Sequence, residues 1–252
     1  MPDILLHLLP HVVSSLLYAA LGIHFWHTRW REKERSLVTL PMQPWERAAI
    51  VVALLIQGFG LYQGVFGGSG MRFSFSYALS LMLWLAVLIY WLESFRSRMD
   101  GLQPMVLPLA AAGAAAPAIF PQLRVIGHAG GLGFLVHFLA AMLAYSLFTL
   151  SALHAVFMGF AERKLHQRSM THSLSSLPPI LTMEALLFRM ITVAFCLLTV
   201  ALVSGVWFSE EIFGKAAALD HKTLFAFASW GIFAALLVGR RVYGWRGRIA
   251  LR

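Results

Sequence analysis

Histidines are the residues of this sequence best suited to chemistry. The chain has ten histidines and eleven Asp and Glu residues among 252 positions, and most of the histidines lie in or beside long apolar segments. An imidazole nitrogen is a common axial ligand of haem iron, and a polar side chain at membrane depth is a functional candidate by default. The histidines therefore indicate metal or haem ligation as the first chemistry to consider.

The segments that carry these histidines resemble membrane-spanning helices. Hydrophobic residues make up 59% of the chain and charged residues 12%, and about 20 helical residues suffice to cross a hydrocarbon core of about 30 Å. Because no soluble module separates the apolar segments, we expect one all-α domain over residues 1–252, a polytopic membrane helix bundle. Its helices, about seven in number, are expected at 5–26, 46–66, 73–95, 104–120, 134–160, 187–208 and 223–240.

The helix at 104–120 has an unusual composition. Its Ala-rich run at 109–116 has small side chains on every face, and small residues let helix backbones approach closely within a membrane. We therefore expect this helix to be buried against its neighbours.

Basic residues predict the orientation of the bundle. With the N-terminus outside, the inner segments 27–47, 96–100, 161–189 and 240–252 hold sixteen of the twenty Lys and Arg residues. Such residues accumulate in cytoplasmic loops. We therefore expect an outer N-terminus, a cytoplasmic C-terminus and a place in the bacterial inner membrane among its lipids. The net charge of +9 then reflects orientation, and no nucleic-acid partner is expected.

This orientation sorts the histidines by depth. His137 opens the helix at 134–160 from the outside, and His221 precedes the last helix on the same side. They lie on different helices at similar depth, so they could face one another as two ligands of one iron. His24 and His154 reach the inner half and form a second possible pair.

Five motifs follow one another in the second half of the chain. They are His137-Phe-Leu-Ala-Ala-Met-Leu-Ala-Tyr-Ser, Glu184-Ala-Leu-Leu-Phe-Arg, Ser204-Gly-Val-Trp, Phe213-Gly with Asp220-His-Lys, and Trp230-Gly-Ile-Phe-Ala. Over about residues 135–250 this ordered set resembles the transmembrane cytochrome c assembly family. The closing Gly244-Trp-Arg-Gly-Arg is most similar to its YpjD-type inner-membrane branch.

The resemblance implies a haem site on the outer side. It assigns His137 as an axial ligand, and Gly214, Asp220 and Lys222 keep their places in a segment that forms a platform for the porphyrin. The chain departs from the family where Phe213 replaces a tryptophan of that platform and His221 replaces a proline.

The remaining members of the expected site follow from the same picture. His221 is the expected second ligand, and the haem propionates are expected to be neutralised by Lys222, Lys215 or Arg124. Asp220 either caps the last helix or accepts a hydrogen bond from a ligand imidazole. Apolar contact with haem is expected from Trp207, Phe213 and Trp230, although Trp207 could equally belong to an interfacial aromatic belt.

The function expected from these features is haem binding or haem handling in cytochrome c biogenesis or haem supply, beside other cytochrome c assembly proteins. No catalytic step of its own is required. The single cysteine, Cys196, excludes a Cys-x-x-Cys-His motif for covalent haem attachment. One alternative is a b-type electron carrier, in which His11 and His24 would serve haems at opposite leaflets. Another is a transporter or structural assembly subunit without haem, for which Gln57 is a polar feature.

The predicted orientation can be tested with reporter fusions. A green fluorescent protein fused after Arg252 should fluoresce and an alkaline phosphatase fused there should be inactive, because the C-terminus is expected inside. The same two reporters inserted after His128 should give the opposite pattern. An active phosphatase after Arg252 would contradict the charge argument.

Overall fold

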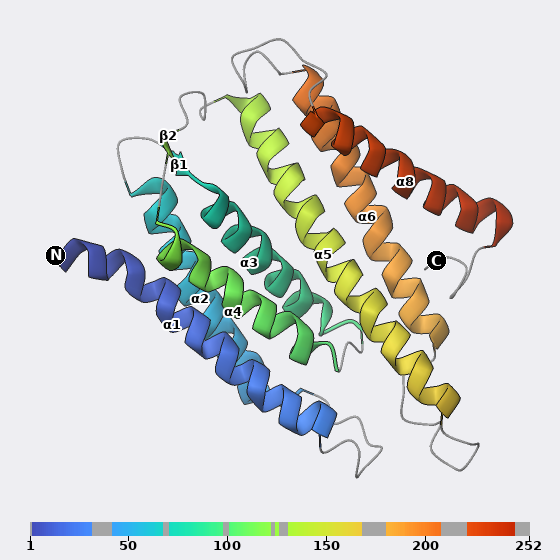
Figure 1. Ribbon diagram of the computed structural model, residues 1–252, viewed down its shortest axis with the longest axis horizontal. Helices are drawn as coiled ribbons and strands as arrows, with labels where there is room; N and C mark the ends of the chain where they lie inside the picture. Colours follow the sequence, from blue (N-terminus) through green and yellow to red (C-terminus); the bar gives the residue numbers. More distant parts are fainter. Residues whose placement is uncertain are drawn as a thin grey trace. The chain divides into compact units, whose positions relative to one another are not determined.

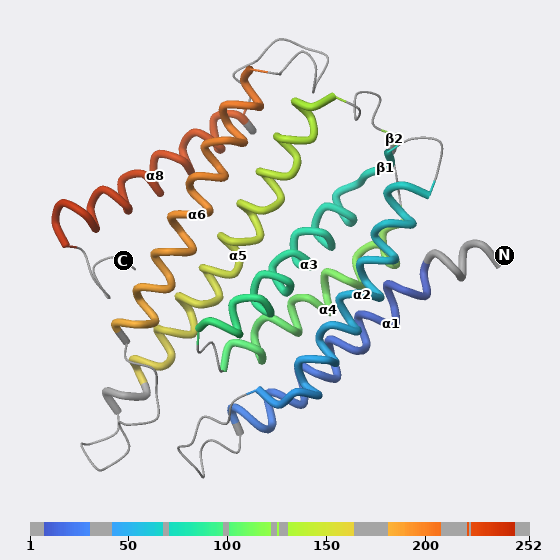
Figure 2. Tube along the Cα trace, turned by 180° about the vertical axis from the view of Figure 1, so that it is seen from behind, coloured from blue at the N-terminus to red at the C-terminus, as the bar shows by residue number. Residues whose placement is uncertain are grey.

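The computed structural model describes residues 2–31, 42–67, 71–97, 101–121, 124–125, 131–167, 180–207 and 221–244. Figure 1 shows the order of the elements, and Figure 2 traces the same chain from behind. The elements are α1 (Pro2–Phe25), the π-helix η1 (Trp26–Arg31), α2 (Pro44–Phe66), β1 (Arg72–Phe73), α3 (Phe75–Glu93), α4 (Gln103–Ile119), β2 (Arg124–Val125), α5 (Leu132–Gln167), α6 (Ile180–Trp207) and α8 (His221–Tyr243). The strands β1 and β2 form one short antiparallel pair.

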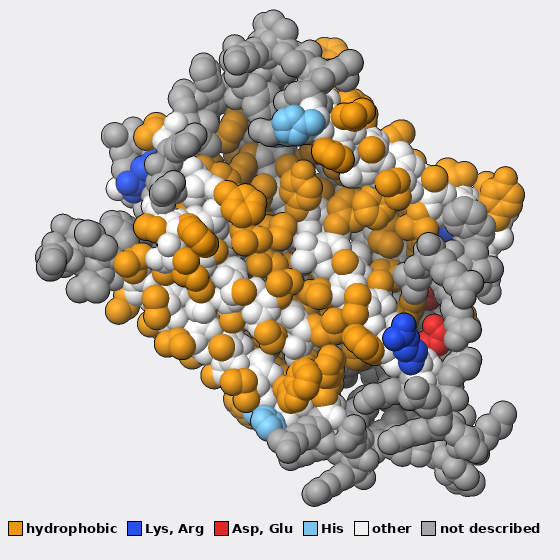
Figure 3. All heavy atoms as spheres, in the orientation of Figure 1, with side chains coloured by type: hydrophobic (Ala, Val, Ile, Leu, Met, Phe, Trp, Pro, Cys, Tyr) orange, Lys and Arg blue, Asp and Glu red, His pale blue; other side chains and the backbone are white. Residues whose placement is uncertain are grey.

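The helices confirm the expected all-α polytopic membrane bundle. Among the described residues, six helices are long and apolar enough to cross a membrane, and α4 is a shorter apolar helix of 17 residues. Hydrophobic side chains cover most of the described surface on the face drawn in Figure 3, as lipid contact requires. The predicted outer N-terminus stays a prediction.

Two helices extend further than the sequence predicts. The start of α6 lies at Ile180, seven residues before the predicted residue 187, and α5 continues to Gln167 beyond the predicted residue 160. Charged residues set the predicted ends, but a long charged side chain can reach the membrane surface while its backbone stays helical. In α6, Glu184 is also paired with Arg240 of α8, so the charge does not end the helix.

The chain forms two compact units, each of which is described by itself. Unit 1 consists of residues 1–126 and 152–180, and unit 2 consists of residues 127–151 and 181–252. The boundary falls within α5, so this helix contributes its first part to unit 2 and its second part to unit 1.

In unit 1, α1 packs against α2 and α4, and α3 packs against the same two helices. Helix α4 is buried along most of its length, as expected from its small residues. Ala110 and Ala114 are fully buried, and a Cβ on Gly113 would collide with the side chain of Leu83. The Ala-rich run therefore provides close contact between helices.

In unit 2, aromatic contacts and an ion pair hold the helices together. Phe148 of α5 stacks on Phe233 of α8 with ring centroids 4.0 Å apart. Near the C-terminal end of α8, Arg240 donates to Glu184 of α6 over 2.8 Å, and its guanidinium lies 3.6 Å from the ring centre of Phe188. Helix α8 is thus fastened at separated points, while much of its apolar surface is exposed.

The burial of α4 predicts a difference between two alanines of one helix. Ala114→Leu should destabilise the protein by about 1–3 kcal/mol, because extra methylene groups overpack a filled core. Ala112→Leu is the matched control, since Ala112 is exposed on the same helix. Thermal unfolding in detergent measures both variants, and equal midpoints would contradict the packing of α4.

Candidate functional site

His137 of α5 is held by the backbone of α6. Its Nδ1 lies 2.9 Å from the carbonyl oxygen of Ala201. A carbonyl oxygen can only accept, so Nδ1 must carry the proton, and the lone pair of the neutral ring is on Nε2. The same arrangement orients metal-binding histidines in other proteins, where the second ring nitrogen donates to a carbonyl or carboxylate.

A Ser-Gly pair on α6 makes room for this imidazole. A Cβ on Gly205 would lie 3.0 Å from Cε1 and 3.2 Å from Nδ1 of His137, so a larger residue there would press on the ring. The Ser204 hydroxyl donates to the Ala201 carbonyl over 3.1 Å, and its oxygen lies 3.4 Å from Nδ1 of His137. We call these residues, Ala201, Ser204 and Gly205, the histidine seat.

Of the aromatic residues expected to contact haem, Trp207 of α6 and Trp230 of α8 lie in the described part of the chain. The indole N–H of Trp230 donates to Thr199 over 2.9 Å, and the ring stacks on Phe195. Trp230 therefore fastens α8 to α6. Trp207 is 80% exposed, and two residues turn a helix through about 200°, so Trp207 leaves α6 on a different face from Gly205.

Several expected site residues belong to the segment between α6 and α8. Phe213, Gly214 and Asp220 lie outside the described residues, as does the side chain of Lys222. His221 is exposed at the first position of α8, in the same unit as His137. The paired ligation by His137 and His221 stays a prediction.

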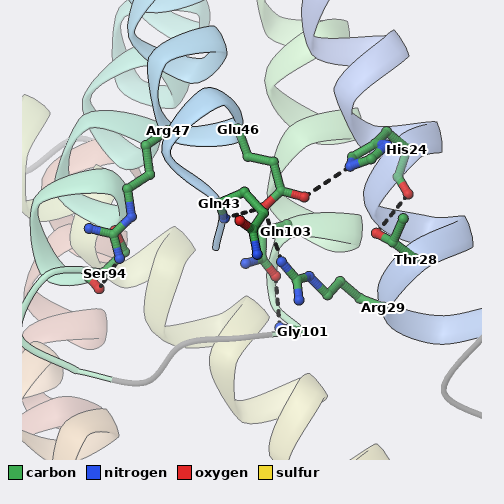
Figure 4. Close-up of polar contacts among 9 residues, drawn as sticks. All are labelled: His24, Thr28, Arg29, Gln43, Glu46, Arg47, Ser94, Gly101 and Gln103. Atoms are coloured by element: carbon green, nitrogen blue, oxygen red, sulfur yellow. Dashed lines mark hydrogen bonds and ion pairs between the residues drawn. The ribbon is translucent and has the colours of Figure 1, made fainter. Parts of the chain in front are cut away.

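In unit 1, the structure places His24 against an acidic residue that the sequence did not single out. Figure 4 shows Glu46 of α2 between His24 and Arg29. Its Oε1 lies 2.9 Å from Nε2 of His24, and its Oε2 accepts from Arg29 over 3.0 Å and from the backbone N–H of Gln43 over 2.7 Å. The side chains of Glu46 and Arg29 are only 4% and 7% exposed.

His24, which is 32% exposed, joins the buried pair of Arg29 and Glu46 in a cluster formed by α1, η1 and α2. The π-helix η1 carries Arg29 inward and also places Trp30, whose indole N–H donates to the carbonyl of Gly101 over 3.0 Å. Gly101 has a φ of +102°, a backbone conformation that favours glycine. The sequence does contain one signal for Glu46, because Gln43 and Glu46 form a capping box at the start of α2.

The cluster bears on the predicted inner ligand pair. An iron ion could bind His24 through Nδ1, or through Nε2 after displacing Glu46. His154 is 2% exposed in the second part of α5. The pairing of His24 and His154 as ligands stays a prediction. The side-chain hydrogen bond that the structure shows for His24 is with Glu46.

His11 lies inside the packing of α1, α2 and α3. It is fully buried, and its ring meets Tyr77 edge to face with centroids 5.5 Å apart. A Cβ on Gly60 would come within 3.2 Å of the His11 ring, and one on Gly64 would collide with Tyr77. With His11 packed in this way and His24 held by Glu46, the geometry does not favour a two-haem electron carrier built on these two histidines.

The fold and the site together define a multi-pass membrane protein in which a histidine of α5 is held by the backbone of α6. The model of the cytochrome C assembly protein family matches residues 45–252. The chain belongs to this family. The match begins at residue 45, so it includes α2, α3 and α4, which the sequence motifs did not assign to the family.

Individual relatives agree with this membership. The chain is 24% identical to the inner membrane protein YpjD of Escherichia coli strain K12 over 209 residues, covering 81% of this chain and 78% of YpjD. It is 29% identical to an uncharacterized 28.8 kDa protein of Azospirillum brasilense over 154 residues, covering 60% of this chain and 57% of that protein. It is 38% identical to the cytochrome c biogenesis protein CcsA of Prochlorococcus marinus over 96 residues, covering 36% of this chain and 30% of CcsA.

No solved structure matches the chain. Membership in the cytochrome c assembly family supports a role in cytochrome c biogenesis.

The buried cluster predicts a large stability loss on removal of its carboxylate. Glu46→Ala should destabilise the protein by about 3–5 kcal/mol, because it removes the carboxylate that accepts from the buried guanidinium of Arg29 over 3.0 Å. Adding Arg29→Met to Glu46→Ala should recover much of the loss, since an apolar side chain then replaces the buried guanidinium.

Thermal unfolding in detergent measures these changes. Glu93→Ala is the control, because Glu93 is half-buried at the end of α3 and its loss should cost less. A double variant no more stable than Glu46→Ala alone would contradict the explanation by loss of the Glu46–Arg29 pair.

Proposed function

We propose that this protein binds haem through His137 and holds or presents it during cytochrome c biogenesis. The observation that carries the proposal is the hydrogen bond from Nδ1 of His137 to the Ala201 carbonyl. It selects the tautomer whose lone pair lies on Nε2, the nitrogen that binds iron in most histidine-ligated haems. Family membership supports the same function, because a relative that shares 96 aligned residues is named as a cytochrome c biogenesis protein.

The donor chemistry of the described residues fits haem. Nδ1 of His137 lies 2.9 Å from the backbone carbonyl oxygen of Ala201, and this contact orients the ring. Gly205 lets the imidazole lie close to α6, and this close fit restricts its rotation. Bound haem would supply an iron that accepts a nitrogen lone pair, together with two anionic propionates.

The chain's own residues would then act as follows. His137 binds and orients the haem on the side predicted to be outer. His221 is the proposed second ligand, because it lies in the same unit and opens α8. Lys222 would pair with a propionate, and Asp220 would either orient a ligand or cap α8. Proteins of the cytochrome c assembly system are the proposed partners that deliver or receive the haem.

Haem titration of the purified protein tests this proposal. The wild type should develop a Soret band with a six-coordinate spectrum. His221→Ala should give a five-coordinate spectrum because one axial ligand is lost. His137→Ala should bind haem more weakly and with an altered spectrum.

His27→Ala is the control for these variants. His27 lies exposed in η1 of unit 1, so its replacement should leave the haem spectrum unchanged. Unaltered spectra for both His137→Ala and His221→Ala would rule out the proposed ligand pair. A wild type that takes up no haem would reject haem binding altogether.

A further inference from the structure

We propose that Ser204 is a positioning residue that sets the ligand strength of His137 by sharing the acceptor of its hydrogen bond. This inference rests on the proposed haem ligation by His137. It concerns the Ser204 hydroxyl, which lies 3.4 Å from Nδ1 of His137, whereas the proposed iron-binding nitrogen is Nε2.

Three polar atoms meet behind the imidazole. The distances are 2.9 Å from His137 Nδ1 to the Ala201 oxygen, 3.1 Å from Ser204 Oγ to the same oxygen, and 3.4 Å from Ser204 Oγ to Nδ1. Both the imidazole N–H and the serine O–H must donate to the carbonyl, because its oxygen only accepts. One carbonyl oxygen thus serves two side-chain donors.

Serine hydroxyls in helices commonly bond to a carbonyl three or four residues earlier, and Ser94 bonds to the carbonyl of Trp91 in this way; what distinguishes Ser204 is the second donor to its acceptor. Other hydroxyl side chains of unit 2 bond to the carbonyl four residues earlier in their own helix. Ser146, Ser151, Thr192 and Thr199 all do so. Ser204 instead donates to the carbonyl three residues earlier, the one that also receives the proton of His137.

Sharing this oxygen weakens its pull on the imidazole proton. A stronger N–H···O=C bond gives the ring more negative character and makes its other nitrogen a stronger donor to a metal. Ser204 is 5% exposed, so in Ser204→Ala water does not readily replace the lost hydroxyl as a donor to the Ala201 carbonyl. Removing the hydroxyl should therefore leave the carbonyl more available to His137.

The apo protein gives the first test. The Nδ1–H proton of His137, observed by NMR in protein labelled with ¹⁵N-histidine, should move downfield in Ser204→Ala. Ser204→Thr should stay at the wild-type position because it keeps the hydroxyl. Gly205→Ala should move the resonance upfield, since the new methyl group pushes the ring off the carbonyl.

The haem-loaded protein gives the second test. Ser204→Ala should shift the haem midpoint potential to a more negative value and raise the Fe–His stretching frequency, because a more anionic imidazole favours ferric iron. Gly205→Ala should lower haem affinity by about 10–100-fold, as loss of an outer-shell partner does. Ser151→Ala, which removes a buried hydroxyl of α5, should change neither the potential nor the stretching frequency.

These readouts separate this inference from the proposed function. If the wild type binds no haem, the proposed function fails and the assignment of ligand strength to Ser204 falls with it. If haem binds through His137 but Ser204→Ala shifts neither the proton resonance nor the potential, this inference alone is overturned. Matching shifts in Ser204→Ala and Ser151→Ala would also overturn it, because the effect would then be a general loss of packing.

Discussion

A polar side chain inside a bilayer has to find its hydrogen-bond partner within the protein, and this constraint shapes the whole structure. Water is absent from the hydrocarbon region, so an unsatisfied polar group there costs several kcal/mol. Helices satisfy their own backbones, which leaves few acceptors for side chains. The histidines His24 and His137 meet this constraint in two different ways, one in each unit.

In unit 1 the partner of His24 is the carboxylate of Glu46. Glu46 lies between His24 and Arg29 at the junction of α1, η1 and α2, and its carboxylate gathers a histidine, a guanidinium and a backbone N–H at one point. Such a buried cluster contributes specificity of packing more than net stability, because desolvation offsets much of the attraction. The π-helix η1 places Arg29 against Glu46 and Trp30 against the carbonyl of Gly101.

In unit 2 the partner of His137 is a backbone carbonyl. A carbonyl acceptor requires Nδ1 to carry a proton and orients the ring, as in the metal-binding histidines of other proteins. The contrast between the two histidines is chemical: Nε2 of His24 faces a carboxylate, whereas His137 directs Nδ1 at a carbonyl. The chain belongs to the cytochrome c assembly family, and this membership supports the proposal that the second arrangement serves haem ligation.

The sequence by itself determined the membrane class, the number and approximate positions of the helices, and the family, because these depend on apolar length, charge distribution and ordered motifs. It also singled out His137 and the Ser204-Gly205 motif. Only the tertiary structure decided which groups these side chains meet. Ala201 carries no side-chain signal, since every residue has the same carbonyl, and its role follows from the approach of α5 to α6. Glu46 and Arg29 lie in a basic stretch that composition alone predicts to be exposed to solvent. Their burial depends on how η1 and α2 pack. The lateral contacts between helices set these pairings, and a one-dimensional pattern of hydrophobicity does not record them.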